Sequence, residues 1–220
     1  MWKIIISVLI IIVIIMIIVF INYKKFSSAS KGQKIPSYEN LKSALLVIDI
    51  QRDLTEKNGK AVYNTEQTDQ IIENTNLIIE NSEKLGLLVI YITHEYKKSF
   101  LIRIFTKGAL EQGTPGAQID PRIKIINKNH FIKHMMDSFS NPEFENFLKA
   151  NKVNHIYVTG LDAEACVDRT VKAALNRNYE VTVVSNAIAA KSEEKRNVKL
   201  WGFEKIGAKV VTTEELLKNP

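Results

Sequence analysis

The stretch that decides the fold is Ile-Tyr-Val-Thr-Gly-Leu-Asp-Ala-Glu-Ala-Cys-Val, residues 156–167. A short run rich in β-branched and aromatic residues stops at Gly160, and a helical pattern begins a few residues later. A strand that turns at a glycine into a helix is the repeating unit of a parallel sheet covered by helices. The stretch therefore predicts an α/β fold, with Cys166 just beyond a strand.

Outward from this stretch, apolar runs alternate with helical patterns along the chain. The runs predict strands at 44–50, 87–93, 123–126, 155–159, 180–185 and 208–211. Helices are predicted at 68–84, 143–150, 163–177 and 192–206, with a short one at the C-terminus. This order predicts a three-layer αβα sandwich with a six-stranded parallel sheet. The segment 95–121, rich in glycine and polar residues, predicts a loop or lid beside the strand ends.

Cys166 is the only cysteine among the 220 residues. The first N–H groups of a helix carry partial positive charge, so a thiol there is expected to have a lowered pKa and to be partly thiolate, the nucleophilic form. The alternative is a buried cysteine that packs as a small apolar side chain. Its position alone leaves both interpretations open.

Two other polar residues are predicted to reach the same edge of the sheet. Asp49 ends the first predicted strand, and Lys133 lies beyond the third. Ligands of parallel sheets bind outside the carboxyl ends of the strands, where the strand order reverses. A carboxylate after a buried strand is costly to leave unpaired, so Asp49 is expected to have a partner or a chemical role. The alternatives are a turn-capping aspartate and a solvated surface lysine.

These positions resemble the motifs of the isochorismatase-like cysteine hydrolases, which include nicotinamidases and N-carbamoyl amidohydrolases. Val47–Gln51 is similar to the family's first motif, a strand that runs into Asp-x-Gln. Gly160 followed six residues later by Cys166 is similar to the last motif, and Lys133 six residues before Phe139 to the middle one. The resemblance covers about residues 42–212. Lys128 is a rival for the lysine, but its spacing would need an insertion.

The resemblance implies an Asp–Lys–Cys triad made of Asp49, Lys133 and Cys166. In it, Cys166 is the nucleophile, Asp49 the general base, and Lys133 the cation that stabilises both anions. The reaction is expected to cleave an amide or carbamoyl C–N bond through a thioester.

The resemblance also implies how the substrate is held. The oxyanion is expected to bind the N–H of Cys166 and one from the turn at Asp162–Ala163, with a cis peptide bond before Asp162. Gln51 is expected to orient the substrate. Departures from the family pattern at Leu54, Ala163 and Asn186 leave the substrate unidentified.

No metal and no cofactor are predicted. Nicotinamidases carry an Asp-x-His metal cluster after the second strand, whereas here His94 is the only histidine in that place. His130 and His134 are four residues apart, but they fall in a loop-like stretch without an acidic third ligand other than Asp137. Nicotinamide is therefore disfavoured as the substrate.

The N-terminal run of residues 4–21 contains no charged residue. Its eighteen residues would form about 27 Å of helix, close to the thickness of the hydrocarbon core of a bilayer. A cleaved signal peptide has a shorter apolar core, so we favour a retained membrane anchor. The predicted division is an anchor at 1–24, a linker at 25–41 and one domain at 42–220.

The cations around this run predict its orientation. Lys3 and the α-amino group precede the run, and four lysines follow it: Lys24, Lys25, Lys31 and Lys34. The positive-inside rule then predicts a single-pass protein of the cell membrane with its domain in the cytoplasm, a reducing compartment that a lone cysteine fits. The other 25 basic residues nearly balance the 24 acidic ones, so no nucleic-acid partner is predicted.

Two functional classes fit these observations. The first is a membrane-tethered cysteine amidohydrolase acting on a small-molecule amide or carbamoyl substrate. The second is a non-catalytic binding or scaffold protein on the same fold, against which the intact triad argues. Ether hydrolysis of the isochorismate type is disfavoured, because in this family it does not use a cysteine nucleophile. A homo-oligomer is left open, since a neighbouring subunit could complete the pocket.

Overall fold

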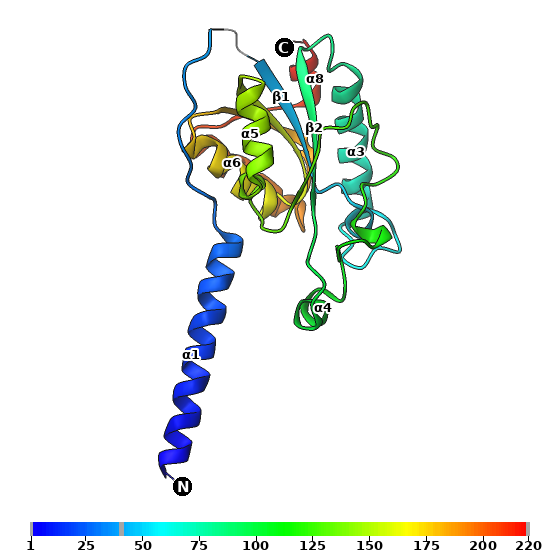
Figure 1. Cartoon of the computed structure of the whole chain (residues 1–220). Helices are drawn as coiled ribbons and strands as arrows, with labels where there is room; N and C mark the ends of the chain where they lie inside the picture. Colours follow the sequence, from blue (N-terminus) through cyan, green and yellow to red (C-terminus); the bar gives the residue numbers. More distant parts are fainter. Residues whose placement is uncertain (1, 40–41, 219–220) are drawn as a thin grey trace.

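The computed structural model describes residues 2–39 and 42–218 as a long helix joined to an α/β domain (Figure 1). Helix α1 (Trp2–Ser27) projects away from the domain. The domain is built on a six-stranded sheet in which all neighbouring strands are parallel. Across the sheet the strands lie in the order β3 (His130–Lys133), β2 (Leu87–His94), β1 (Lys42–Ile48), β4 (Val153–Gly160), β5 (Glu180–Ile188) and β6 (Lys209–Val211).

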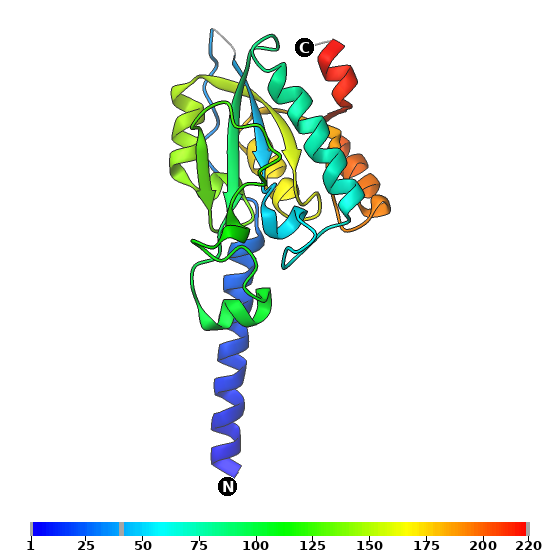
Figure 2. The ribbon, with the colours of Figure 1, turned by 90° about the vertical axis from the view of Figure 1, so that its right-hand side faces the viewer.

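Helices cover both faces of this sheet, as the alternating pattern predicts (Figures 1 and 2). One hydrophobic cluster joins the sheet to α5 (Pro142–Ala150), α6 (Cys166–Asn176) and α7 (Glu193–Lys205). The other joins it to α2 (Arg52–Thr55), α3 (Thr65–Glu80) and α8 (Thr213–Lys218). The predicted three-layer αβα sandwich is therefore confirmed.

The third strand lies later in the chain than predicted. Residues 123–126 form no strand, whereas His130–Lys133 pairs with β2. Ile123 is buried against the α3 side of the sheet, but Ile125 and Ile126 are exposed. The Tyr91 hydroxyl donates to the Lys124 carbonyl and accepts from the Ile126 N–H, so a side chain replaces sheet pairing there. The prediction of a strand at 123–126 is wrong, because only one isoleucine of this apolar run packs into the core.

The predicted loop at 95–121 contains two short helices. They are α4 (Phe100–Thr106) and the 3₁₀ turn η1 (Pro115–Ala117). Figures 1 and 2 show α4 below the sheet, on the side from which α1 projects. The polar composition of the segment conceals this helix, whose sequence Phe-Leu-Ile-Arg-Ile-Phe-Thr is largely apolar.

The chain after α1 runs along the domain. The Ser30 N–H donates to the Asp137 carboxylate at 2.8 Å, and the Ser30 carbonyl accepts from Arg177 at 3.1 Å. The Ile35 N–H donates to the Arg177 carbonyl at 2.9 Å, and Ala29 and Ile35 pack against the core. The predicted linker is therefore docked over part of its length.

Gly160 brings the end of β4 against the end of β1. Its φ of +112° is one that side chains rarely adopt, and a Cβ there would lie 1.9 Å from the Ile48 carbonyl oxygen. Only glycine allows this approach, which sets the spacing between the segments that carry Asp49 and Cys166.

Replacing Gly160 with alanine is expected to lower the free energy of unfolding by about 3 kcal/mol or more, because the clash is with backbone and the φ is unfavourable. The matched control is Gly202→Ala inside α7, where nothing lies within 4 Å of the added Cβ. That change is expected to stabilise the chain by about 0.5–1 kcal/mol. Denaturation of the full chain in detergent measures both, and equal effects would contradict this account.

Candidate active site

The three residues of the predicted triad meet at the carboxyl edge of the sheet. The Lys133 Nζ lies 2.7 Å from Asp49 Oδ2 and 3.2 Å from Cys166 Sγ. Asp49 follows β1, Lys133 ends β3, and Cys166 begins α6 after β4. Lys133 is only 1% exposed, so its ammonium is held away from bulk water between the carboxylate and the sulfur. The rival lysine, Lys128, is exposed and lies outside the pocket.

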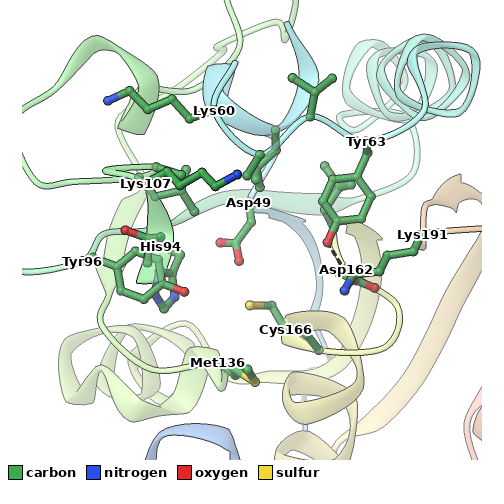
Figure 3. Close-up of a pocket in the computed structure, with 18 of the residues that line it drawn as sticks. Asp49, Lys60, Tyr63, His94, Tyr96, Lys107, Met136, Asp162, Cys166 and Lys191 are labelled. Atoms are coloured by element: carbon green, nitrogen blue, oxygen red, sulfur yellow. Dashed lines mark hydrogen bonds between the residues drawn. The ribbon is translucent and has the colours of Figure 1, made fainter. Parts of the chain in front are cut away.

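The sheet topology explains this meeting point. The strand order reverses between β1 and β4, so the chain leaves these two neighbouring strands in different directions and opens a crevice. Asp49 has a left-handed backbone with φ of +53°, a conformation that aspartate tolerates better than most residues. This turn lets its carboxylate face Cys166 across the crevice (Figure 3).

His94 belongs to the same cluster, although the sequence analysis assigned it no role. Its Nδ1 lies 3.2 Å from Lys133 Nζ, and its ring is buried beside those of Phe26 and Tyr96. Its position in the sequence could have indicated a role, because His94 ends β2 in the same way that Asp49 follows β1. Burial and the Lys133 ammonium hold the pKa of His94 well below its ordinary value, so the ring is neutral near pH 7 and Nδ1 can accept from the ammonium.

The thiol of Cys166 is not a low-pKa thiol at rest, which corrects the expectation from the helix start. Removal from water, together with the Asp49 charge, raises the pKa of Cys166 more than the Lys133 ammonium lowers it. The sequence indicates that Cys166 begins a helix, but it does not indicate that the buried Asp49 carboxylate lies beside its sulfur. The resting sulfur is therefore protonated, and a base would be required to convert it to a thiolate.

The carboxylate of Asp49 has the properties of a base for the Cys166 thiol. Burial raises the pKa of its carboxyl above the ordinary value, and the Lys133 ammonium offsets this only in part. The pKa of Lys133 is raised, since burial lowers it but the Asp49 charge and the hydrogen bonds to Asp49 and Cys166 raise it further. Asp49 Oδ1 is buried without a hydrogen-bond partner among the described residues. This oxygen is thus free to accept a proton.

The donor atoms of Asp49, His94 and Cys166 all lie within 4.8 Å of one another, close enough to hold a metal ion. The Lys133 ammonium, however, contacts all three residues. A divalent ion bound by them would be repelled by this buried cation. The geometry favours the ammonium as the cation of the site.

Gln51 lies behind the pocket and does not line it. Its amide donates to the carbonyls of His94 and Ala117 at 2.9 and 2.6 Å, and its oxygen accepts from the His94 N–H at 2.8 Å. The side chain is fully buried, so Gln51 positions the end of β2 and does not reach the space where a substrate would bind.

The turn before Cys166 agrees with the prediction in one respect and not in another. The Leu161–Asp162 peptide bond is cis, as expected. Of the two N–H groups of this turn, that of Ala163 donates to the Ala189 carbonyl at 2.9 Å and is not available as an oxyanion donor, whereas that of Asp162 has no acceptor among the described residues. Asp162 lines the pocket, where its carboxylate accepts from the Tyr63 hydroxyl at 2.7 Å (Figure 3).

The site opens into a cavity of about 630 Å³, a size suited to a small organic molecule. Figure 3 shows Cys166 and Asp49 facing each other across this cavity. Three lysines also line it, namely Lys60, Lys107 and Lys191, and its apolar lining includes Phe26, Leu54, Phe105, Leu110 and Met136. Two of these apolar residues come from outside the compact sandwich: Phe26 from α1 and Phe105 from α4.

Comparison with known proteins agrees with this architecture. The Isochorismatase domain family matches residues 43–215, and the chain belongs to this family. A probable inactive nicotinamidase of Arabidopsis thaliana is 26% identical over 79% of this chain and 93% of its own length. The crystal structure of an isochorismatase-like hydrolase from Alkaliphilus metalliredigens superposes with a TM-score of 0.73 at 22% identity, covering 80% of this chain and 98% of that one.

An N-carbamoylsarcosine amidase from Thermoplasma acidophilum superposes with a TM-score of 0.66 at 25% identity. The match covers 79% of this chain and 97% of the amidase. The family thus includes hydrolases that act on C–N bonds, together with a relative described as inactive.

Replacing Asp49 with asparagine is expected to lower the pKa of the Cys166 thiol by roughly 1–3, because a neighbouring negative charge is removed while the Lys133 ammonium remains. Alkylation by iodoacetamide, followed against pH by intact mass, reads this pKa at a single site, since the chain has one cysteine. The control is Glu164→Gln, which removes a partly exposed carboxylate that is paired with Lys195. A thiol pKa that rises or stays constant in Asp49→Asn would contradict the electrostatics described above.

Proposed function

We propose that the chain is a membrane-anchored cysteine hydrolase that cleaves an amide or carbamoyl C–N bond of a small molecule through a thioester. The observation that carries the proposal is the contact of one buried ammonium with both a carboxylate and the sole thiol. A buried ion pair costs desolvation and is weak support for stability alone, so its place beside a nucleophile at a pocket favours a catalytic use. The amidase among the structural relatives supports the C–N class.

In the first half of the reaction, Asp49 takes the proton of the Cys166 thiol as the sulfur attacks the substrate carbonyl carbon. The raised pKa of Asp49 suits this transfer, because a stronger base is better matched to a thiol. The Lys133 ammonium stabilises the negative charge whether it lies on Asp49 or on the Cys166 sulfur. The tetrahedral intermediate then collapses, the C–N bond breaks, and Asp49 returns the proton to the departing nitrogen.

In the second half, Asp49 deprotonates a water molecule that attacks the thioester carbonyl. The C–S bond breaks, the acid product leaves, and the thiol is restored. The proposed oxyanion donors are the N–H groups of Cys166, at the first turn of α6, and of Asp162, because neither has an acceptor among the described residues. Asp162 is proposed to shape the pocket wall through its bond to Tyr63.

The alternative is a non-catalytic binding or scaffold protein, and the probable inactive relative gives it some support. The contacts among Asp49, Lys133 and Cys166 argue for the enzyme, because a site used only for binding has no need of an acceptor oxygen beside a thiol. The two classes differ in whether Cys166 becomes acylated.

We also propose that α1 anchors the domain to the cell membrane, with residues 1–24 as the anchor, 25–41 as the linker and 42–220 as the domain. Residues Ile5–Ser27 form a helix long and apolar enough to cross a bilayer, with an 18-residue window of mean hydropathy 3.4 in which no residue is buried. A signal sequence near the N-terminus would have the same properties. The greater length of the apolar run and the four lysines after it favour a retained anchor with the domain in the cytoplasm.

Turnover is expected to need all three triad residues. Intact-mass screening against small amides and carbamoyl compounds should detect an acyl adduct on Cys166, which Cys166→Ser abolishes. For the best substrate, Asp49→Asn is expected to lower kcat/KM by roughly a hundredfold to ten-thousandfold. Lys133→Met should impair turnover strongly, whereas Lys128→Met, an exposed lysine outside the pocket, should leave it unchanged. Full function in Cys166→Ser would favour the scaffold.

A further inference from the structure

Helix α4 exposes large apolar side chains to the surroundings of the protein. Phe100, Leu101, Ile104 and Phe105 are 78%, 65%, 57% and 86% exposed, and no residue of α4 is buried. Four such neighbours on one short helix form a contiguous apolar surface, which a protein kept wholly in water would be expected to cover.

The position of α4 suggests what covers this surface. In both Figures 1 and 2, α4 lies beyond the carboxyl edge of the sheet and level with the half of α1 that is nearer the domain. In the sequence, this half of α1 contains the end of the apolar run and then Lys24 and Lys25, where the membrane surface is expected. The bilayer that surrounds α1 would therefore also meet α4.

The charges around α4 fit the same environment. Residues 97–107 contain Lys97, Lys98, Arg103 and Lys107 and no acidic residue. Apolar side chains flanked by cations are typical of helices that lie in a membrane interface, where the cations contact anionic headgroups.

The active-site cavity connects to this surface. Phe105 of α4 and Phe26 of α1 both line it, together with Lys107. The Phe26 ring packs on Tyr96 and edge-on to His94, with centroid separations of 6.1 and 5.8 Å, and His94 contacts Lys133. The two elements that would touch the bilayer thus also form walls of the pocket that holds Cys166.

We propose that α4 lies in the membrane interface beside α1, so that the pocket opens toward the bilayer and takes an amphiphilic amide whose apolar chain stays in the lipid. This inference rests on the proposed hydrolase function and extends it by naming the substrate class. The amide head reaches Cys166 between Phe26 and Phe105, and the chain extends along the apolar surface of α4.

The first experiment tests whether α4 lies in the membrane, and it does not require the protein to turn over a substrate. The full chain is reconstituted in vesicles of phosphatidylcholine with a minority of phosphatidylglycerol, and flotation with the vesicles reports the anchor. Leu101→Trp in a chain that also carries Trp2→Phe and Trp201→Phe gives one reporter on α4. Its control is the Trp2→Phe chain, whose remaining Trp201 is 62% exposed on α7.

Phosphatidylcholine brominated on its acyl chains is expected to quench about half of the emission of the Leu101→Trp reporter, because interfacial helices lie about 5–10 Å deep, and to leave Trp201 unquenched. A chain that floats while the reporter on α4 keeps its full emission would overturn the proposal and leave the anchor intact.

The second experiment tests access to the pocket, using Cys166 as the only alkylation site. In the same vesicles, N-dodecyl chloroacetamide should alkylate Cys166 faster than N-ethyl chloroacetamide. The double variant Leu101→Ser/Ile104→Ser, at residues that do not line the pocket, should slow the dodecyl reagent about tenfold and leave the ethyl reagent unchanged.

The matched control is Val198→Ser/Trp201→Ser, which removes two side chains of similar exposure from α7. This control should change the alkylation rate of neither reagent, because it leaves α4 intact and the reagents partition into the vesicles to the same extent. Equal dodecyl rates in the two double variants would overturn the proposal. Loss of amide turnover with these alkylation results intact would instead count against the hydrolase function alone.

Discussion

The buried ammonium of Lys133 is the interaction on which the rest of the site depends. A lysine that is 1% exposed is stable only beside anions or acceptors, and here Asp49, Cys166 and His94 surround it. The arrangement requires the ends of β1, β2, β3 and β4 to lie at one edge, which the parallel sheet provides. It also requires the close approach of β4 to β1, which Gly160 permits. The parallel sheet and the close approach at Gly160 are thus needed both for the fold and for the contacts of Lys133.

Much of this organisation could be predicted from local patterns. Buried runs such as Ala44–Ile48 and the glycine turn at Gly160 specify a parallel sheet, because such strands are apolar on both faces. The third strand was misplaced, since pairing with β2 decides where it forms and a four-residue strand with one fully buried side chain has little pattern. The triad spacing indicated which side chains would meet, and the structure brings them together.

The electrostatics of the site could not be predicted in the same way. The pKa of Cys166 depends on the distance to Asp49 and on removal from water, neither of which is encoded in nearby sequence. His94 and Phe26 reach the site through strand register and through docking of the linker on Asp137 and Arg177. Ala163 was unsuitable as an oxyanion donor for a similar reason, since its N–H bonds to the distant Ala189. Contacts between remote segments decide these properties.

A protonated sulfur at rest has a consequence for chemical durability. Peroxides oxidise thiolates much faster than thiols, and redox-sensing cysteines are accordingly acidic and accessible. Cys166 has the opposite character, with a raised pKa and a carboxylate at its side. The chain also has no second cysteine to trap a sulfenic acid as an internal disulfide. Slow oxidation at rest is therefore expected, and in the proposed mechanism the sulfur becomes a strong nucleophile only while Asp49 holds its proton.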